Sequence, residues 1–178
     1  MATRKTKKEA VKPTKGLPQN AHIIGSGEVE QQIITDTLRE NYMPYAMSVI
    51  MSRAIPEIDG FKPSHRKLLY TMYKMGLLTG GRTKSANIVG QTMKLNPHGD
   101  AAIYETMVRL SRGNQTLLHP YVDSKGNFGK AYSRDMAYAA SRYTEAKLDS
   151  ICQELFADID KDTVDFVDYY DGTMKEPT

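Results

Sequence analysis

The 178-residue chain has no tryptophan and one cysteine, Cys152. A single thiol can form neither a disulfide within the chain nor a multi-cysteine zinc site, so we expect Cys152 to pack inside a helix. No apolar run approaches the roughly 20 residues of a membrane-spanning helix. The basic start of the chain is not followed by the apolar core of a secretory signal. These absences predict a cytoplasmic protein that does not interact with membranes.

Charge is divided into blocks along the sequence, although the net charge is only +3. Residues 1–16 carry +5, residues 17–60 carry −4, residues 61–142 carry +9 and residues 143–178 carry −7. A basic centre between acidic flanks suggests a surface for a polyanion. From charge alone, an ordinary solvated surface explains the pattern about equally well.

The first sixty residues are expected to form two regions. Residues 1–22 are rich in Lys, Thr and Pro and poor in large apolar side chains, which predicts a disordered basic arm. A helical arm is expected over residues 23–60, with a short helix from about Val29 to Asn41 and a second helix that starts near Pro44. Proline is best tolerated in the first turn of a helix, so Pro44 is expected to separate the two.

Residues 61–160 are expected to form the main domain. Pro63 marks the start of a helix that ends near Gly76, and a second helix is expected from about Lys84 to Lys94. A third follows the break at Asn96-Pro97-His98-Gly99, with Asp100 as its N-cap. Two short helices joined by a glycine-containing turn are typical of a helix-turn-helix, although many helical hairpins bind nothing.

The rest of this region predicts a small β element and a last helix. The stretch from His119 to Gly129 alternates apolar and turn-forming residues, which suits a basic β-hairpin wing. A helix is expected from Thr144 to about Asp158, because apolar residues recur there at helical spacing. The expected fold class is therefore mainly α with a small β wing.

A resemblance to a known family rests on five segments, which occur in this order: YAMSVIMSRAIPEIDGFKPSHRKLLY, GRTKSANIVGQ, NPHGDAAIYETMVRL, VDSKGNFG and AASRYTEAKL. Together they closely resemble the A subunit of the bacterial type IIA DNA topoisomerases, gyrase and topoisomerase IV. The match spans roughly Leu38 to Gly172. It implies a winged-helix domain of the catabolite-activator type in the breakage-reunion region, with residues 161–178 as the start of a truncated tower region.

The resemblance implies that Tyr143 is the nucleophile that attacks DNA, because the family tyrosine follows an arginine in a segment ending RYTE. A tyrosyl phosphodiester is a good leaving group, so the strand break can be resealed without external energy. Negative charge accumulates on the phosphoryl oxygens during attack, and nearby cations stabilise it. Arg142 takes this role by its place in the motif. Motif position also puts Arg53 and His98 beside the phosphate.

Each of these residues also has an ordinary structural explanation. Without the family, Tyr143 would be a half-buried aromatic at a helix start. Arg53 would cap the C-terminus of its helix, where a cation is favoured by about 0.3–1 kcal/mol. His98 would bond to backbone in a turn. If a helix does follow Tyr143, its N-terminus is expected to point towards the phosphate.

A set of mostly basic or polar residues matches the family's DNA-contacting positions or lies next to them. These residues are Lys62, His65, Arg66, Lys67, Lys84, Ser85, Asn96, Gly99 and Asn127. We expect them mainly to contact phosphates, which position a duplex but carry little sequence information. The alternative is a solvated helix face, and Phe128 beside Asn127 equally suits a core.

Several positions depart from the usual family pattern. Ala101 and Glu105 stand where the family usually has a serine and an acid that anchor the water-metal bridge to quinolone drugs. Ala101 offers no hydroxyl, which predicts weakened quinolone binding. Asn96 replaces the first histidine of the usual HPHGD, and Lys67 replaces a more frequent arginine.

Asp158, Asp160 and Asp162 alternate superficially like metal ligands, but we interpret them as an acidic loop. No phosphate loop occurs in the sequence, so we expect no metal or other cofactor on this chain. The resemblance places magnesium and ATP on a partner B subunit. The expected partners are double-stranded DNA, a second A subunit in a homodimer, and the B subunit. The chain ends where the family chain passes into its tower domain, so we expect a fragment or an early-terminated chain that is inactive in isolation.

Three functions stay open at this point. The first is DNA cleavage and rejoining through a 5′-phosphotyrosyl intermediate, within an ATP-dependent enzyme that controls supercoiling or decatenation. The second is a non-catalytic winged-helix fragment that binds DNA. The third is an interaction fragment that pairs with full-length subunits. The Arg142-Tyr143 pair favours the first.

Overall fold

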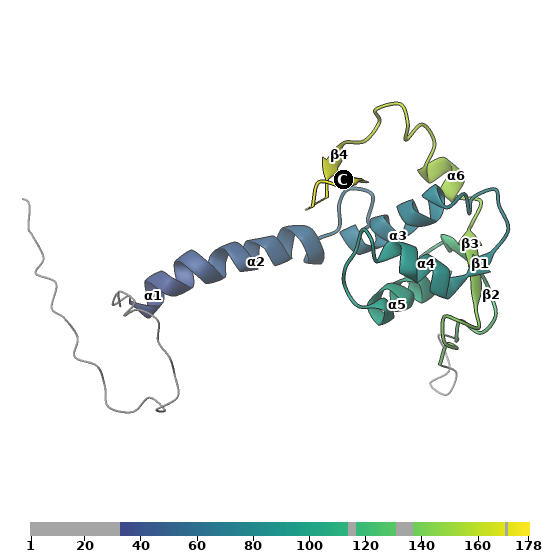
Figure 1. The fold of residues 1–178 in the computed structure, drawn as a ribbon, viewed down its shortest axis with the longest axis horizontal. Coiled ribbons are helices and arrows are strands. Elements are labelled where there is room, and N and C mark those ends of the chain that lie inside the picture. Colours follow the sequence, from purple (N-terminus) through teal and green to yellow (C-terminus); the bar gives the residue numbers. More distant parts are fainter. Residues whose placement is uncertain (1–32, 114–116, 131–136, 170) are drawn as a thin grey trace, which may run out of the picture.

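The computed structural model describes residues 33–113, 117–130, 137–169 and 171–178. A helical arm extends from a body that contains three longer helices and small antiparallel sheets (Figure 1). The expected fold class is confirmed in its general terms, mainly α with a small β component. The predicted basic arm, residues 1–22, lies outside the described residues. Within the described ranges, no helix combines the length and the apolar character needed to span a bilayer.

The arm is one continuous helical segment with four consecutive parts. These are α1 (Ile34–Thr37), the π-helical stretch η1 (Leu38–Tyr42), α2 (Met43–Val49) and the π-helical stretch η2 (Ile50–Ala54). Pro44 lies in the first turn of α2, so the predicted helix start near Pro44 is confirmed, but the backbone continues helically from η1 and the expected break between two helices is absent. Proline has no N–H to donate and its ring crowds the carbonyl four residues earlier, and the wider turns of η1 accommodate both effects.

Three helices of the body confirm the sequence predictions. They are α3 (Pro63–Lys74), α4 (Ser85–Thr92) and α5 (Asp100–Leu110). The N-cap of α5 is Gly99, one residue earlier than expected, while the Asp100 carboxylate accepts a hydrogen bond from the Ala101 N–H at 2.9 Å. Gly76 follows α3 with φ of +72°, a left-handed conformation that glycine adopts without steric cost.

A three-stranded antiparallel sheet lies beside these helices. It consists of β1 (Thr83–Lys84), β2 (Val122–Lys125) and β3 (Glu145–Leu148) in the order β1-β3-β2. The predicted hairpin within His119–Gly129 is wrong, because β2 pairs with the distant β3. Ser124 is opposite Ala146 in this register.

The helix expected from Thr144 to Asp158 is also wrong over its first half. Strand β3 occupies residues 145–148 of that half, and only α6 (Cys152–Leu155) is helical. Ala146 and Leu148 alternate with more exposed residues along β3, as in a strand with one buried face. Pairing with strands on both sides satisfies the β3 backbone, and this tertiary contact outweighs the helical spacing of the apolar residues.

The C-terminal residues form a second, smaller sheet. β4 (Phe166–Asp168) pairs antiparallel with β5 (Lys175–Pro177), and the turn between them includes Gly172 with φ of +68°. The Asp171 carboxylate accepts hydrogen bonds from the hydroxyl and the N–H of Thr173, which lower the pKa of Asp171. The boundaries predicted at residues 60 and 160, and the tower region beyond them, remain predictions.

The core lies between α3, α4, α5 and the three-stranded sheet. Ten of its side chains are at most 1% exposed: Leu68, Leu69, Met72, Ile88, Met107, Val108, Val122, Ala146, Leu148 and Cys152. The predicted burial of Cys152 is confirmed. Tyr73 of α3 stacks on Phe156 at a centroid distance of 4.6 Å, which attaches the segment after α6 to the core.

We predict that Leu68→Ala lowers the free energy of unfolding by about 2–5 kcal/mol, because it leaves a cavity at a site that is 0% exposed. Urea denaturation followed by circular dichroism measures the change. Met51→Ala in the arm is the control: Met51 is 69% exposed, and we expect a change within about 0.5 kcal/mol. Equal effects of the two substitutions would contradict the assignment of the core.

Candidate functional site

Tyr143 is an exposed tyrosine that immediately precedes Thr144 and β3. Tyr143 is 66% exposed, so much of this residue faces solvent. The guanidinium carbon of Arg142 lies 4.8 Å from the centroid of the Tyr143 ring. The Tyr143 N–H donates to the Ala140 carbonyl at 2.9 Å. The two residues thus form one exposed pair with a cation against the aromatic ring.

The structure corrects one expectation about this pair. The segment after Tyr143 is strand β3, so no helix N-terminus directly follows the tyrosine. Tyr143 is also more exposed than the half-buried aromatic that ordinary packing would predict. Among the residues that the structure describes, Arg142 places its guanidinium over the Tyr143 ring.

Arg53 and His98 form a second pair, 45 residues apart in sequence. Arg53 Nη2 donates to His98 Nε2 at 3.4 Å, and both side chains are exposed. Arg53 lies near the end of η2, and His98 lies in the break before α5. No hydrogen bond or ion pair within the described part of the chain joins this pair to Arg142 or Tyr143.

A buried cluster of three hydroxyl groups lies next to Tyr143. We call Ser85, Tyr104 and Thr144 the hydroxyl cluster; their exposed fractions are 0%, 6% and 0%. Thr144 Oγ1 lies 2.8 Å from Ser85 Oγ and 2.9 Å from the Tyr104 hydroxyl. Ser85 is thus buried among protein groups, and its predicted contact with DNA stays a prediction.

Three further bonds attach residues 139–144 to α4 and α5. The Ser85 N–H donates to the Thr144 carbonyl at 3.0 Å, and the Ala86 N–H donates to the Ser141 carbonyl at 3.1 Å. The Tyr104 hydroxyl donates to the Ala139 carbonyl at 2.7 Å. Sequence reasoning missed this network, because local patterns do not show which hydroxyls meet across 40 or 59 residues.

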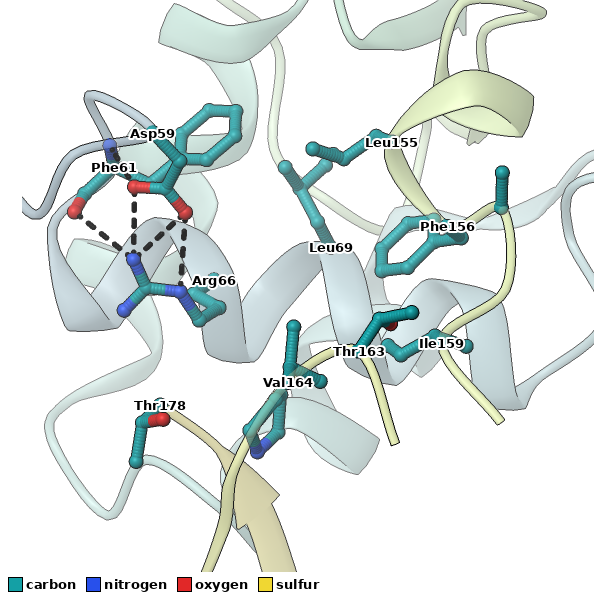
Figure 2. Close-up of a pocket in the computed structure, with 12 residues that line it drawn as sticks. Asp59, Phe61, Arg66, Leu69, Leu155, Phe156, Ile159, Thr163, Val164 and Thr178 are labelled. Atoms are coloured by element: carbon teal, nitrogen blue, oxygen red, sulfur yellow. Dashed lines mark hydrogen bonds and ion pairs between the residues drawn. The ribbon is translucent and has the colours of Figure 1, made fainter. Parts of the chain in front are cut away.

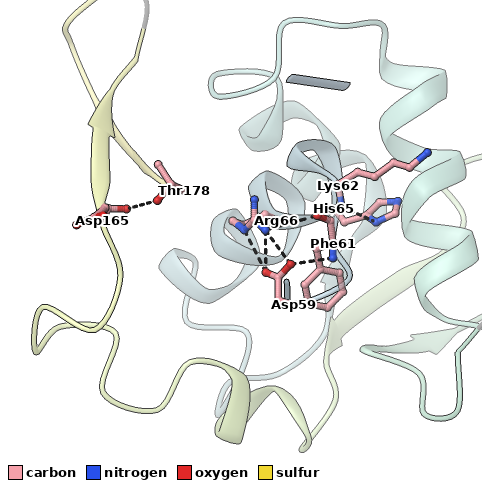
Figure 3. Close-up of polar contacts among 7 residues, drawn as sticks. All are labelled: Asp59, Phe61, Lys62, His65, Arg66, Asp165 and Thr178. Atoms are coloured by element: carbon pink, nitrogen blue, oxygen red, sulfur yellow. Dashed lines mark hydrogen bonds and ion pairs between the residues drawn. The ribbon is translucent and has the colours of Figure 1, made fainter. Parts of the chain in front are cut away.

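Two of the four residues in the predicted basic cluster at the start of α3 are engaged in ion pairs. Arg66 binds the Asp59 carboxylate at 2.8 Å, and its side chain is only 13% exposed. Asp59 also accepts the Phe61 N–H at 2.8 Å, so it fixes the entry to α3 (Figure 3). Lys67 pairs with Glu176 at 2.8 Å and is 20% exposed. Lys62 is exposed, and its N–H donates to His65 Nδ1 at 3.4 Å.

The other predicted DNA-contacting residues lie in several environments. Lys84 is exposed and pairs with Glu145 at 2.9 Å. Asn96 is buried, and Gly99 is the exposed N-cap of α5. Asn127 donates from its amide to the Ala137 carbonyl at 3.2 Å, which links the end of the β2 turn to the segment before Tyr143.

Phe128 is buried, so the core interpretation of this residue is confirmed. The predicted contact of its neighbour Asn127 with DNA is untested.

Charged side chains alternate in sign across the three-stranded sheet. Asp123 pairs with Arg82 at 2.6 Å and with Lys147 at 3.7 Å, while Glu145 pairs with Lys84 and, at 3.8 Å, with Lys125. The Lys84 ammonium lowers the pKa of Glu145, and Asp123 raises the pKa of Arg82. These groups are accessible to solvent, so the pairs add little stability. The four cations in these pairs outnumber the two carboxylates, so the charged groups on the sheet have a net positive charge.

A hollow of about 90 Å³ lies between α3 and the C-terminal segment (Figure 2). Asp59 and Arg66 lie at one side of it, and Leu69, Phe156 and Val164 contribute apolar walls. The two charged groups satisfy each other, and the hollow is smaller than the roughly 300–1,000 Å³ of typical ligand sites. We assign no ligand to it.

Two other kinds of reactive group could support chemistry, the Cys152 thiol and clusters of side chains that bind a metal ion. Burial raises the pKa of the Cys152 thiol to about 12, so the thiol stays protonated and unreactive at neutral pH. Within the described ranges, no group of three or more His, Cys, Asp or Glu side chains is placed to hold a metal ion. The Asp158–Asp162 stretch includes an ion pair between Asp158 and Lys161 at 2.8 Å.

The fold and the exposed Arg142-Tyr143 pair define a helix-rich domain with a candidate nucleophile beside a positive sheet. Comparison with known families finds that the family of DNA gyrase/topoisomerase IV A subunits matches residues 53–178. The chain therefore belongs to this family of gyrase and topoisomerase IV A subunits.

Individual relatives agree with this assignment. The DNA gyrase A subunit of Staphylococcus epidermidis (strain ATCC 12228) is 48% identical over 158 residues, which is 87% of this chain and 17% of that protein. The DNA gyrase A subunit of Staphylococcus aureus (strain NCTC 8325) is 47% identical over 158 residues, covering 87% of this chain and 18% of that protein. The chain thus spans less than a fifth of the length of these relatives.

We predict that His65 makes the stability of the protein depend on pH. Burial lowers its pKa below 6.5, and Lys62, Arg109 and Arg66 add to the effect. Between this lowered pKa and 6.5 the unfolded chain binds more protons, so the free energy of unfolding rises with pH through that window. The stabilising contribution is present above pH 6.5 and is lost as the pH falls through the folded pKa.

Urea denaturation between pH 5 and pH 8, compared with His65→Gln, measures this contribution. The free energy of unfolding of the wild type, relative to that of His65→Gln, should fall as the pH falls. Parallel pH profiles for the two proteins would contradict the prediction.

Proposed function

We propose that this chain is the DNA-cleavage part of the A subunit of a type IIA topoisomerase, with Tyr143 as its nucleophile. The observation that carries the proposal is the exposed Tyr143 with Arg142 against its ring, in a chain that is 47–48% identical to DNA gyrase A subunits over 158 residues. The reaction would be a transient double-strand break that lets DNA change its supercoiling or linkage. A cytoplasmic location would follow from this role in bacteria.

In the proposed reaction the Tyr143 oxygen attacks the scissile phosphorus after losing its proton. A bond forms between phosphorus and the tyrosine oxygen, the bond to the 3′ oxygen breaks, and that oxygen takes up a proton. The 5′ end remains attached to Tyr143, and the reverse reaction reseals the strand. Arg142 would stabilise the charge that accumulates on the phosphoryl oxygens, and the Arg53–His98 pair would lie beside them.

We propose that the cofactors of the assembled enzyme bind to another subunit and not to this chain. We assign magnesium and ATP to the partner B subunit. Metal ions bound there would help to neutralise the phosphoryl oxygens. None of the roles given to Arg142, Arg53 or His98 depends on the detail of that site.

We also propose that the body is a winged-helix domain of the catabolite-activator type. In it α4 and α5 are the helix-turn-helix, and the sheet β1-β3-β2 is the wing. Contacts of α3 with α4 and α5 and the connection of β1 directly to α4 support this assignment. The domain would comprise residues 61–160, with the arm before it and the tower region after it.

The proposed DNA-binding surface combines the positive sheet with the start of α3. Exposed Lys62 and Lys84 would contact phosphates directly. Arg66 and Lys67 are engaged by Asp59 and Glu176, so they would either exchange partners or support the surface from within. Exchange would cost more for these two pairs than for the exposed pairs of the sheet, because the Arg66 and Lys67 side chains are only 13% and 20% exposed.

Exposed apolar residues on the arm support contact with a further protein chain. No residue of α1, η1, α2 or η2 is buried. The exposed large side chains there are Ile34, Leu38, Tyr42, Met43, Tyr45, Met47, Ile50 and Met51. An exposed apolar surface of this kind marks a contact with another protein. We propose two partners in the assembled enzyme, a second A subunit and the B subunit.

The test uses a hybrid A subunit, in which this chain replaces the matching segment of the Staphylococcus aureus DNA gyrase protein. The hybrid is mixed with the B subunit, magnesium, ATP and supercoiled DNA, then denatured. We expect protein attached covalently to DNA 5′ ends. Tyr143→Phe should abolish these adducts, because it removes the attacking oxygen, and should preserve salt-sensitive DNA binding.

Tyr138→Phe is the matched control, because Tyr138 is also exposed and lies in the same segment. It should leave the adducts unchanged. Adducts that persist in Tyr143→Phe would overturn the assignment of the nucleophile. A folded hybrid that binds DNA and forms no adduct would instead support a non-catalytic DNA-binding module.

A second prediction concerns the drug-binding position. Ala101 is exposed in the first turn of α5, and Glu105, one turn later, pairs with Arg109 at 2.8 Å. Ala101→Ser supplies the missing hydroxyl and should lower the quinolone concentration for half-maximal cleavage about fivefold, the effect of one hydrogen bond. Ala102→Ser, at the next exposed position, is the control. Unchanged drug sensitivity in Ala101→Ser would refute this role.

A further inference from the structure

The segment that carries Tyr143 is attached to the body through buried hydroxyl groups as well as through backbone hydrogen bonds. We propose that the hydroxyl cluster of Ser85, Tyr104 and Thr144 positions Tyr143 for attack, so that these three are positioning residues. This inference rests on the proposed function, because it concerns the geometry of the same reaction. It assigns a catalytic consequence to residues whose side chains are buried beside the tyrosine.

Tyr143 has little packing of its own to fix its position. Its side chain is 66% exposed and is contacted by Arg142, whose side chain is also exposed. The backbone on either side is fixed instead. Thr144 is 0% exposed, and the carbonyls of Ala139 and Ser141 accept bonds from Tyr104 and Ala86. Tyr143 is one residue from Thr144, so a shift of Thr144 moves it directly.

The polar character of this cluster distinguishes it from ordinary core packing. A buried hydroxyl is costly unless it is hydrogen-bonded, and these three bond to one another over 2.8 and 2.9 Å. Apolar side chains of the same shape would also fill the space. Hydrogen bonds fix direction as well as distance, so the cluster selects one conformation of residues 139–144.

The cluster also connects Tyr143 to the helices that we propose to contact DNA. Ser85 is the first residue of α4 and follows Lys84, while Tyr104 lies about one turn into α5, after His98 and Gly99. A duplex bound by α4 and α5 is therefore in a fixed position relative to residues 139–144. In-line attack needs the reacting atoms about 3–3.5 Å apart, and a misplacement of about 1 Å can cost about a hundredfold in rate.

The first part of the test measures amide hydrogen exchange in the 178-residue chain. Thr144→Val removes the central hydroxyl and keeps its shape, and Thr144→Ser keeps the hydroxyl. Exchange at the amides of Ala86 and Tyr143 should accelerate about tenfold in Thr144→Val, because their acceptors lie in the loosened segment. Thr144→Ser should restore slow exchange.

Thr92→Val is the matched control. Thr92 is 0% exposed, and its hydroxyl bonds to the Ile88 carbonyl at 2.8 Å within α4, away from residues 139–144. It should leave exchange at Ala86 and Tyr143 unchanged. Equal acceleration in Thr92→Val and Thr144→Val would show general loosening of the fold and would overturn the proposal.

The second part measures adduct formation by the hybrid A subunit with the B subunit. At saturating DNA, the rate should fall at least about tenfold in Thr144→Val and in Tyr104→Phe. Tyr104→Phe keeps the ring that lies 6.1 Å from Phe128 and 5.4 Å from Tyr138, centroid to centroid. The DNA concentration for half-saturation should stay constant, and Thr144→Ser should recover most of the rate.

The two failures are distinguishable. If the unsubstituted hybrid forms no Tyr143-dependent adduct, the proposed function fails, and the positioning role falls with it. If the unsubstituted hybrid is active and both Thr144→Val and Tyr104→Phe keep its rate, the proposed function stands and the positioning role is refuted.

Discussion

The pairing of β3 as the central strand between β1 and β2 is the constraint on which the candidate site depends. It buries Ala146 and Leu148 against the helices and fixes where Thr144 enters the body. Tyr143 then lies outside, one residue before Thr144, next to Arg142. Because a strand satisfies its backbone bonds through its neighbours, the register of β3 is set by two other segments and leaves no freedom to slide.

Electrostatics forms a second level of organisation. The basic block of residues 61–142 and the acidic block of residues 143–178 are separate in sequence but partly neutralise each other in the fold. Lys67 pairs with Glu176 from the C-terminal sheet, and Lys84 pairs with Glu145 from β3. Lys84 is thus held in place while its side chain stays 56% exposed, which suits the phosphate-contacting surface that we propose.

Local sequence patterns predicted the three body helices well, because Pro63, Gly76 and the Asn96–Gly99 break are physical start and stop signals. They failed where neighbours elsewhere in the chain decide the structure. The apolar residues after Thr144 have helical spacing, yet pairing with β1 and β2 makes the first of them a strand. Pro44 lies at the start of α2 as expected, yet the π-helical turns before it keep the arm continuously helical.

The sequence alone identified the RYTE segment, and with it Tyr143 and Arg142, since residue identity and order are all that such a motif requires. The fold alone decided that Arg53 lies 3.4 Å from His98 and that Ser85, Tyr104 and Thr144 share one buried cluster. A hydrogen bond across 40 to 59 residues depends on how the whole chain folds back on itself. Periodicity along the chain reports only which face of an element is buried.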